Sequence, residues 1–193
     1  MNKQKIEKYI PYLILISVAI FLSMQLFNKD FNIMIDDGIQ HISRIIENYI
    51  EISKGNLYPE IFSRMCNNFG YSWNIFYGPL TAFLPLIFKL ITNSFIIAMK
   101  IYLLITLIAS GITMYKFLSI STKNKYIGIL GGVLYMSAPY HLTDMYNRLA
   151  VAEFTSFVFI PLVFLGLWSI FNEEKKRKIC LIIGATGLIL THI

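Results

Sequence analysis

The residues best suited to chemistry lie in the segment 36–44, which reads Asp36-Asp37-Gly38-Ile39-Gln40-His41-Ile42-Ser43-Arg44. It places an acidic pair ahead of a histidine and an arginine. A carboxylate can act as a general base or bind a metal ion, and cationic side chains can stabilise a phosphate leaving group. The segment is therefore a candidate active site for a reaction on an anionic substrate.

A helix is predicted to position these residues. Asp37 is the expected N-cap, with Gln40 three residues later in a capping-box arrangement. At about 100° per residue, one sector of this helix is polar and the opposite sector is apolar. The polar sector holds Asp37, His41, Arg44, Asn48 and Glu51. The Gly55-Asn56 pair followed by Pro59 is expected to end the helix.

The composition predicts an integral membrane protein. Hydrophobic residues make up 56% of the chain and the mean hydropathy is +0.60. The apolar run 9–27 follows Lys3, Lys5 and Lys8 and lacks a small-x-small cleavage pattern, so it is expected to be an uncleaved anchor with a cytoplasmic N-terminus. The net charge of +6 is explained by basic residues at the ends of apolar runs. No basic face with stacking aromatics points to nucleic acid as a partner.

We expect an all-α, polytopic transmembrane helix bundle. Its spanning segments are predicted at about 9–27, 95–118, 126–140, 150–171 and 179–193, with the last one truncated. Residues 28–94 are expected to form an outer loop with interfacial helices. An odd number of membrane crossings must separate this outer loop from the cytoplasmic Lys116, so only one of the apolar runs 74–92 and 95–118 can span. The run 74–92 is the one expected not to span, because it contains Pro79, Pro85 and Lys89. The Gly131-Gly132 pair should allow close helix packing. Residues 1–193 are then the N-terminal part of one membrane domain in the plasma membrane.

A second outer loop carries further ionisable residues. It runs from Tyr140 to Arg148 and is followed by Glu153 in the next apolar run. A carboxylate at a helix centre in the membrane costs roughly 2.5–3.5 kcal/mol, and less near an end, so Glu153 is a functional candidate. Acids and cations from both loops are expected at the outer face, where they would suit a reaction on an anionic lipid.

These motifs resemble the GT-C superfamily of membrane glycosyltransferases, which use polyprenyl-phosphate-linked sugars as donors at the outer face. The resemblance extends through Gly55-Asn56-Leu57-Tyr58-Pro59, Phe76-Tyr77-Gly78-Pro79-Leu80 and the loop from Ala138 to Glu153. The chain is especially similar to bacterial multi-pass proteins labelled 6-pyruvoyl-tetrahydropterin synthase-related. That label does not imply pterin chemistry, since the three histidines lack the spacing of a zinc-binding cluster.

The resemblance implies a sugar transfer to a glycan, lipid or protein acceptor of the cell envelope. Asp37 would be the catalytic carboxylate, with Asp36 in support and Glu153 as the second acid. A divalent metal ion held by Asp37 and Glu153 is one option for a cofactor. The residues expected to contact donor phosphate or acceptor are His41, Arg44, Lys100, Arg148, His141 and Asp144. Membrane lipids are the other expected partners.

Simpler interpretations of the same residues stay open. Asp37 could be only a helix cap, and His41 with Arg44 could form an interfacial face that contacts lipid headgroups. Lys100 could snorkel towards the interface, and Glu153 could pair with Arg148. His141 and Asp144 could be ordinary loop residues, and the aromatics around 69–77 could form either an interfacial belt or a sugar-stacking platform. The alternative function is a non-enzymatic transporter or scaffold for lipid-linked glycans.

Overall fold

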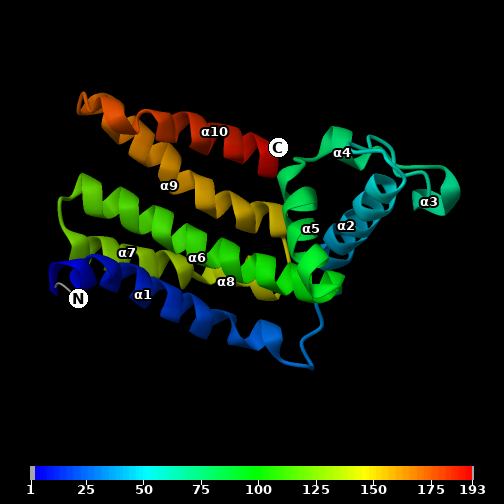
Figure 1. Cartoon of the computed structure of the whole chain (residues 1–193), viewed down its shortest axis with the longest axis horizontal. Helices are drawn as coiled ribbons and strands as arrows, with labels where there is room; N and C mark the ends of the chain where they lie inside the picture. The colour runs from blue at the N-terminus through cyan, green and yellow to red at the C-terminus, as the bar shows by residue number, and fades with distance from the viewer. Residues whose placement is uncertain (1–2, 193) are drawn as a thin grey trace.

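The computed structural model describes residues 3–192, and these form a bundle of helices (Figure 1). No strand occurs in this range beyond an isolated bridge between Phe62 and Tyr71. The predicted all-α bundle is therefore confirmed. The helices are α1 (Lys3–Ser23), η1 (Met24–Phe27), α2 (Asp37–Ser53), α3 (Met65–Asn68), α4 (Trp73–Phe76), α5 (Leu80–Thr92), α6 (Phe95–Ser121), α7 (Lys125–Met136), α8 (Pro139–Tyr146), α9 (Val151–Phe171), η2 (Lys175–Arg177) and α10 (Ile179–Thr191).

Helices α1, α6, α7, α9 and α10 run side by side along the long axis of the molecule (Figure 1). Three segments of the described chain are long and apolar enough to cross a membrane, namely Glu7–Phe27, Phe95–Ser121 and Val151–Phe171. Helices α5, α7 and α10 are apolar but shorter. The bundle thus has the length and composition of a membrane domain.

The helices of the bundle approach one another closely where glycine faces a neighbour. A Cβ atom on Gly132 of α7 would lie 2.9 Å from the carbonyl oxygen of Gly111 on α6 and 2.8 Å from Leu15 of α1. The predicted close packing at Gly132 is therefore present. In a membrane, where hydrophobic burial does not drive helices together, such close backbone contact is a main source of association. The buried side chains of Leu15, Leu103, Leu107 and Phe154 belong to the hydrophobic core of the bundle.

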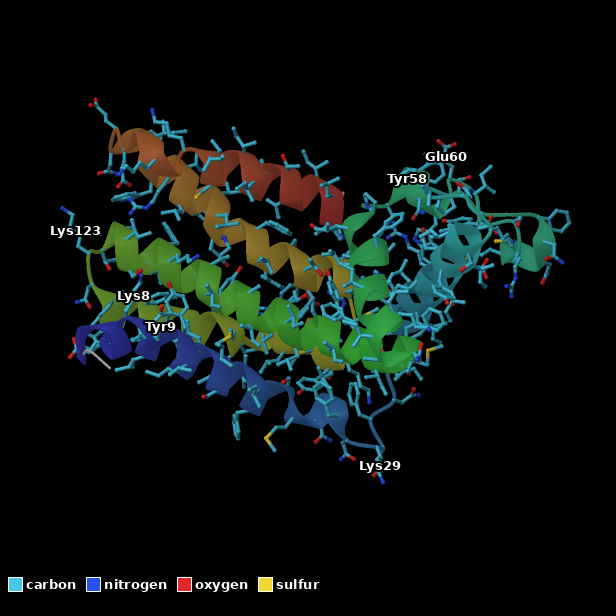
Figure 2. All side chains as sticks on the ribbon, in the orientation of Figure 1. Lys8, Tyr9, Lys29, Tyr58, Glu60 and Lys123 are labelled. Carbon is cyan, nitrogen blue, oxygen red and sulfur yellow. The ribbon has the colours of Figure 1, made fainter. Side chains whose placement is uncertain are left out.

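The two ends of the bundle differ in what they carry. One end, which we call the basic end, holds the start of α1, the turn between α6 and α7, and η2; Lys8 and Lys123 mark it in Figure 2. The opposite end holds α2, α3, α4, α5 and α8, and we call it the α2 end; Lys29, Tyr58 and Glu60 mark it in Figure 2. Both predicted outer loops therefore lie at the same end of the molecule.

Two of the predicted helices are interrupted in the structure. The expected helix 126–140 ends at Met136, because Pro139 lacks the N–H that would continue it and instead begins α8. The expected helix 74–92 consists of α4 and α5, which are separated by residues 77–79. Helix α5 crosses the ends of α6 and α9 and does not run alongside them (Figure 1). Its position relative to a membrane surface stays a prediction.

Candidate active site

The guanidinium of Arg148 lies at the centre of a cluster of acids at the α2 end. Its Nη1 donates to Asp144 Oδ1 and to Glu153 Oε2, each at 2.9 Å, and to the Tyr140 hydroxyl at 3.3 Å. Its Nη2 lies 4.0 Å from Asp37 Oδ2. The Tyr140 hydroxyl also donates to Glu153 Oε1. We call Asp37, Tyr140, Asp144, Arg148 and Glu153 the Arg148 cluster.

The cluster is assembled from two chain segments that are far apart in sequence. Asp37 is the first residue of α2, whereas the other members come from α8, the following loop and the first turn of α9. A backbone hydrogen bond joins the segments, since the N–H of Asp37 donates to the carbonyl oxygen of Arg148 at 3.0 Å. The two outer loops are thus brought together at the acids that the sequence singled out.

The backbone beside this junction is strained and tightly packed. Asp36 and Leu149 have φ values of +40° and +50°, in a region that residues with a Cβ rarely occupy. A Cβ on Gly38 would lie 2.3 Å from the carbonyl oxygen of Ile33 and 2.9 Å from Leu149 Cδ1. Only glycine therefore fits at position 38 without moving the backbone at Ile33 and the side chain of Leu149, the residue after Arg148. Such strain clusters at functional sites.

The predicted capping role of Asp37 is wrong. Helix α2 begins at Asp37, so that the N-cap position falls on Asp36, and no side chain makes a capping hydrogen bond there. Asp37 is instead a first-turn residue, where its negative charge is favoured by the helix dipole. The predicted end of α2 is confirmed, because Gly55 adopts φ +96° and the N–H of Asn56 donates to the carbonyl oxygen of Glu51 at 3.1 Å.

The acids of the cluster differ in environment. The side chain of Asp144 is fully buried, and its Oδ2 has no hydrogen-bond partner within residues 3–192. Burial, reinforced by the charge of Glu153, raises the pKa of Asp144 to about 6. Hydrogen bonds to Glu153 and Tyr140 raise the pKa of Arg148, which stays charged. The side chain of Asp37 is 46% exposed, so it is the acid most accessible to a substrate.

The donor set does not fit a resident divalent metal ion in this arrangement. Both oxygens of Glu153 and one oxygen of Asp144 are engaged by Arg148 or Tyr140. The guanidinium occupies the central position that a cation would take. Within residues 3–192, no group of three or more His, Cys, Asp and Glu side chains is placed to hold a metal ion.

The polar sector of α2 faces protein. Arg44 is 1% exposed and donates to Asn74 Oδ1 from Nε at 3.1 Å and from Nη2 at 2.9 Å. Nη2 also donates to the carbonyl oxygens of Tyr77 and Gly78, at 3.0 and 2.9 Å. Asn74 in turn donates to Asn48 Oδ1 and to the carbonyl oxygen of Pro59. Arg44 thus fixes α2 against the segment 74–78, and burial lowers its pKa to about 10.

His41 lies between this network and the Arg148 cluster. Its side chain is buried and packs edge-on against the ring of Tyr77, with centroids 5.9 Å apart. The ring of Tyr77 makes a similar contact with His192 at 6.0 Å. Burial and the charge of Arg44 lower the pKa of His41 to about 4, which keeps it neutral near pH 7.

Two further predicted residues lie outside the cluster. Lys100 is 9% exposed and its Nζ lies 5.7 Å above the ring of Phe31. His141 is buried against Phe154 and Phe157, and its Nδ1 lies 3.0 Å from the carbonyl oxygen of Tyr135. This burial lowers the pKa of His141 to about 4. The structure therefore does not bring either residue to Arg148.

Three residues of the site were not singled out by the sequence. Tyr140 bridges Arg148 and Glu153, Asn74 anchors Arg44, and Tyr77 packs on His41. Tyr77 and Tyr140 occur in the motifs that carry the family resemblance, which was the available signal for them. Asn74 had no such signal, because its partner Arg44 lies 30 positions earlier in the chain.

Residues 75–193 match a family described as the 6-pyruvoyl-tetrahydropterin synthase related domain, a membrane protein. The chain belongs to this family. The matched residues include four members of the Arg148 cluster. Asp37, Arg44 and Asn74 precede the matched residues in the chain. The protein is therefore a membrane protein.

A curated relative of this PTPS-related protein is an uncharacterized protein of Lactococcus lactis subsp. cremoris (strain MG1363). The two are 24% identical over 186 residues, which are 94% of this chain and 30% of the relative. The chain thus spans about 30% of the length of the curated relative that it matches. No solved structure matches the chain.

Proposed function

We propose that the chain forms the catalytic end of a membrane glycosyltransferase of the GT-C type, which transfers a sugar from a polyprenyl-phosphate donor to a cell-envelope acceptor. The observation that carries this proposal is the convergence of Asp37, Asp144 and Glu153 on Arg148 from two distant segments. The cluster lies at the opposite end of the bundle from the basic segments (Figure 1). By the positive-inside rule, that end faces the outside of the plasma membrane.

Asp37 is the acid we assign as general base. Asp144 is buried, and Glu153 has both oxygens hydrogen-bonded, whereas Asp37 lies 4.0 Å from Arg148 and is partly exposed. An acceptor hydroxyl would attack the anomeric carbon of the donor sugar, forming the new glycosidic bond. The bond from that carbon to the phosphate oxygen breaks, polyprenyl phosphate leaves with the electron pair, and Asp37 takes the hydroxyl proton.

Arg148 is placed to stabilise the phosphate that leaves. Within residues 3–192, all side-chain hydrogen bonds of Arg148 come from Nη1, so Nε and Nη2 remain available to a substrate. Guanidinium groups bind phosphate through two parallel donors, which suits this geometry. Glu153, Asp144 and Tyr140 hold the guanidinium in position. Asp36 remains a candidate for a supporting acid, and His41, Lys100 and His141 remain candidates for further substrate contacts.

Replacing Asp37 with Asn tests the assignment. Purified protein in nanodiscs would be given polyprenyl-phosphate-linked glucose, mannose or N-acetylglucosamine with a membrane glycan extract as acceptor, and release of polyprenyl phosphate would be measured. We expect Asp37→Asn to slow release by roughly 10²–10⁴-fold, the usual contribution of a general base. The matched control is Asp30→Asn, because Asp30 is an exposed loop residue outside the cluster.

Transfer by Asp37→Asn at the rate of the unchanged protein would contradict the enzymatic assignment. So would the absence of release from every donor. Binding of a donor without any release would favour the alternative function, a non-enzymatic transporter or scaffold for lipid-linked glycans.

A further inference from the structure

A second feature of the α2 end is a cleft of about 490 Å³, and one of its lining residues, Tyr77, lies within reach of the charges of Asp37, Glu153 and Arg148. It lies between α2, the loop that contains α3, and α4, elements that gather at one end of the molecule (Figure 1). Its lining consists of Gln40, Met65, Cys66, Tyr71, Trp73 and Tyr77. The volume falls within the range of about 300–1,000 Å³ that is typical of small-molecule sites.

The lining has the chemistry of a saccharide site. It combines three aromatic rings with one side-chain amide and two phenolic hydroxyls, and none of its residues carries a formal charge at neutral pH. Aromatic rings pack against the C–H face of a sugar ring, while amide and hydroxyl groups bond its hydroxyls. The absence of charged lining residues favours a neutral sugar over an anionic one.

We propose that this cleft binds a neutral saccharide unit. The role of that saccharide as the acceptor rests on the function proposed above, but the binding itself does not. Gln40 stands one helical turn after Asp37, and Tyr77 packs on His41 at a ring separation of 5.9 Å. A sugar in the cleft would therefore lie beside the carboxylate assigned as the base.

The aromatic rings are held in place before any ligand binds. Tyr71 pairs with the buried Phe62 through two backbone hydrogen bonds of 2.9 and 3.2 Å, and its ring meets Trp73 edge-on at 5.5 Å. Tyr77 is fixed by Arg44, whose guanidinium carbon lies 5.1 Å from the ring centroid. A site that is already ordered loses less conformational freedom on binding.

An interfacial belt is the competing explanation for these aromatics. Belt residues contact lipid headgroups singly along the membrane surface. Here three rings and an amide line a single concave site, whereas the 93% exposed Phe69 on the same loop is not part of its lining. Phe69 therefore serves as an internal control for an aromatic that does not line the cleft.

Saturation-transfer NMR on the protein in nanodiscs tests the proposal without using any donor. The probes are maltose, cellobiose and N,N′-diacetylchitobiose, each titrated against the unchanged protein and against variants. We expect saturable binding of at least one probe. Trp73→Ala and Gln40→Ala should each raise its Kd roughly tenfold, which corresponds to one lost stacking or hydrogen-bonding contact. Phe69→Ala should leave the Kd unchanged.

Gln40→Ala keeps the test valid if the aromatic variant fails to fold, because Gln40 is an exposed residue on a different element from Trp73. Absence of saturable binding for all three probes would overturn the proposal. Equal weakening by Phe69→Ala would also overturn it, since that result indicates a lipid-facing belt. If the probe binds to the unchanged protein and to Asp37→Asn but the unchanged protein transfers no sugar, the saccharide site stands and the proposed transferase activity is wrong. If the unchanged protein transfers sugar but binds no probe, the transferase activity stands and the saccharide site is wrong.

Discussion

Replacing Arg148 with Gln removes the cation on which the acids of the cluster converge. Loss of one partner from a buried ion pair costs about 3–5 kcal/mol, whereas exposed pairs contribute only about 0–1 kcal/mol. Asp144 is 0% exposed and Arg148 is 38% exposed. Between those limits, we expect Arg148→Gln to lower the free energy of unfolding by about 2 kcal/mol at pH 8. For a chain of this size the melting temperature should fall by roughly 4–8 °C.

The loss of stability in Arg148→Gln should depend on pH, because the charge of Asp144 depends on pH. Its pKa is raised from 3.8 to about 6 in the folded protein, so its contribution to stability is present at low pH and is lost as the pH rises through about 6. Arg148 opposes this rise, and without it the pKa of Asp144 should climb further. At pH 5 Asp144 is mostly protonated in both proteins. The difference between variant and unchanged protein should therefore be smaller at pH 5, where only the pairing with Glu153 is lost, than at pH 8.

The assay is thermal unfolding in nanodiscs at pH 5 and pH 8, with two companion variants. Arg177→Gln is the matched control, because Arg177 is about as exposed as Arg148, at 37%, whereas its partner Glu174 is 36% exposed and Asp144 is 0% exposed. It should change the melting temperature little at either pH. Asp144→Asn combined with Arg148→Gln should recover most of the loss, since no buried charge is then left unpaired. Equal losses at both pH values, or no recovery in the double variant, would refute the reasoning.

Two remaining predictions concern the Arg44 network and the orientation in the membrane. Arg44→Ala and Asn74→Ala should each lower the free energy of unfolding by roughly 3 kcal/mol. Because the two residues share hydrogen bonds, a double-mutant cycle should show a coupling energy of about 1–3 kcal/mol. Strictly additive losses would contradict a shared network. In a background with Cys66 and Cys180 replaced by Ser, Ser72→Cys should react with a membrane-impermeant maleimide on intact cells, whereas Ser121→Cys should react only after permeabilisation. Reaction of both sites on intact cells would disprove the orientation.

The sequence predicted the helix that carries the site but not what that helix touches. Side-chain periodicity placed His41 and Arg44 in one sector of α2, and both are buried together. Periodicity cannot say whether a polar sector faces solvent, lipid or protein. In the structure the polar sector faces protein, because the guanidinium of Arg44 donates to the side-chain oxygen of Asn74, which lies 30 residues away in the chain. Without such a partner, burial of Arg44 would be too costly.

The cap of α2 was mispredicted for a related reason. Local rules favour Asp37 as the N-cap, because Asp is a preferred residue there and Gln40 follows at the right distance. In the structure the N–H of Asp37 is taken by the carbonyl oxygen of Arg148, a contact between distant segments. Beside this contact the backbone of Asp36 has φ +40°, and Asp36 occupies the N-cap position in place of Asp37. The pairing of Arg148 with Glu153 was foreseeable, since both lie within one short stretch of chain.

Helix α2 links the Arg148 cluster to the hydrogen-bond network of Arg44. Arg44 can therefore affect the Arg148 cluster although it does not contact that cluster. One end of α2 is held to the loop after α8 by the Asp37–Arg148 backbone bond, and its middle is held to residues 74–78 by Arg44. The position of the Asp37 carboxylate therefore depends on both anchors. Misplacement of a reacting group by about 1 Å can cost on the order of 10²-fold in rate. Arg44 is thus a positioning residue in the proposed reaction, and its loss should lower turnover more than it weakens substrate binding.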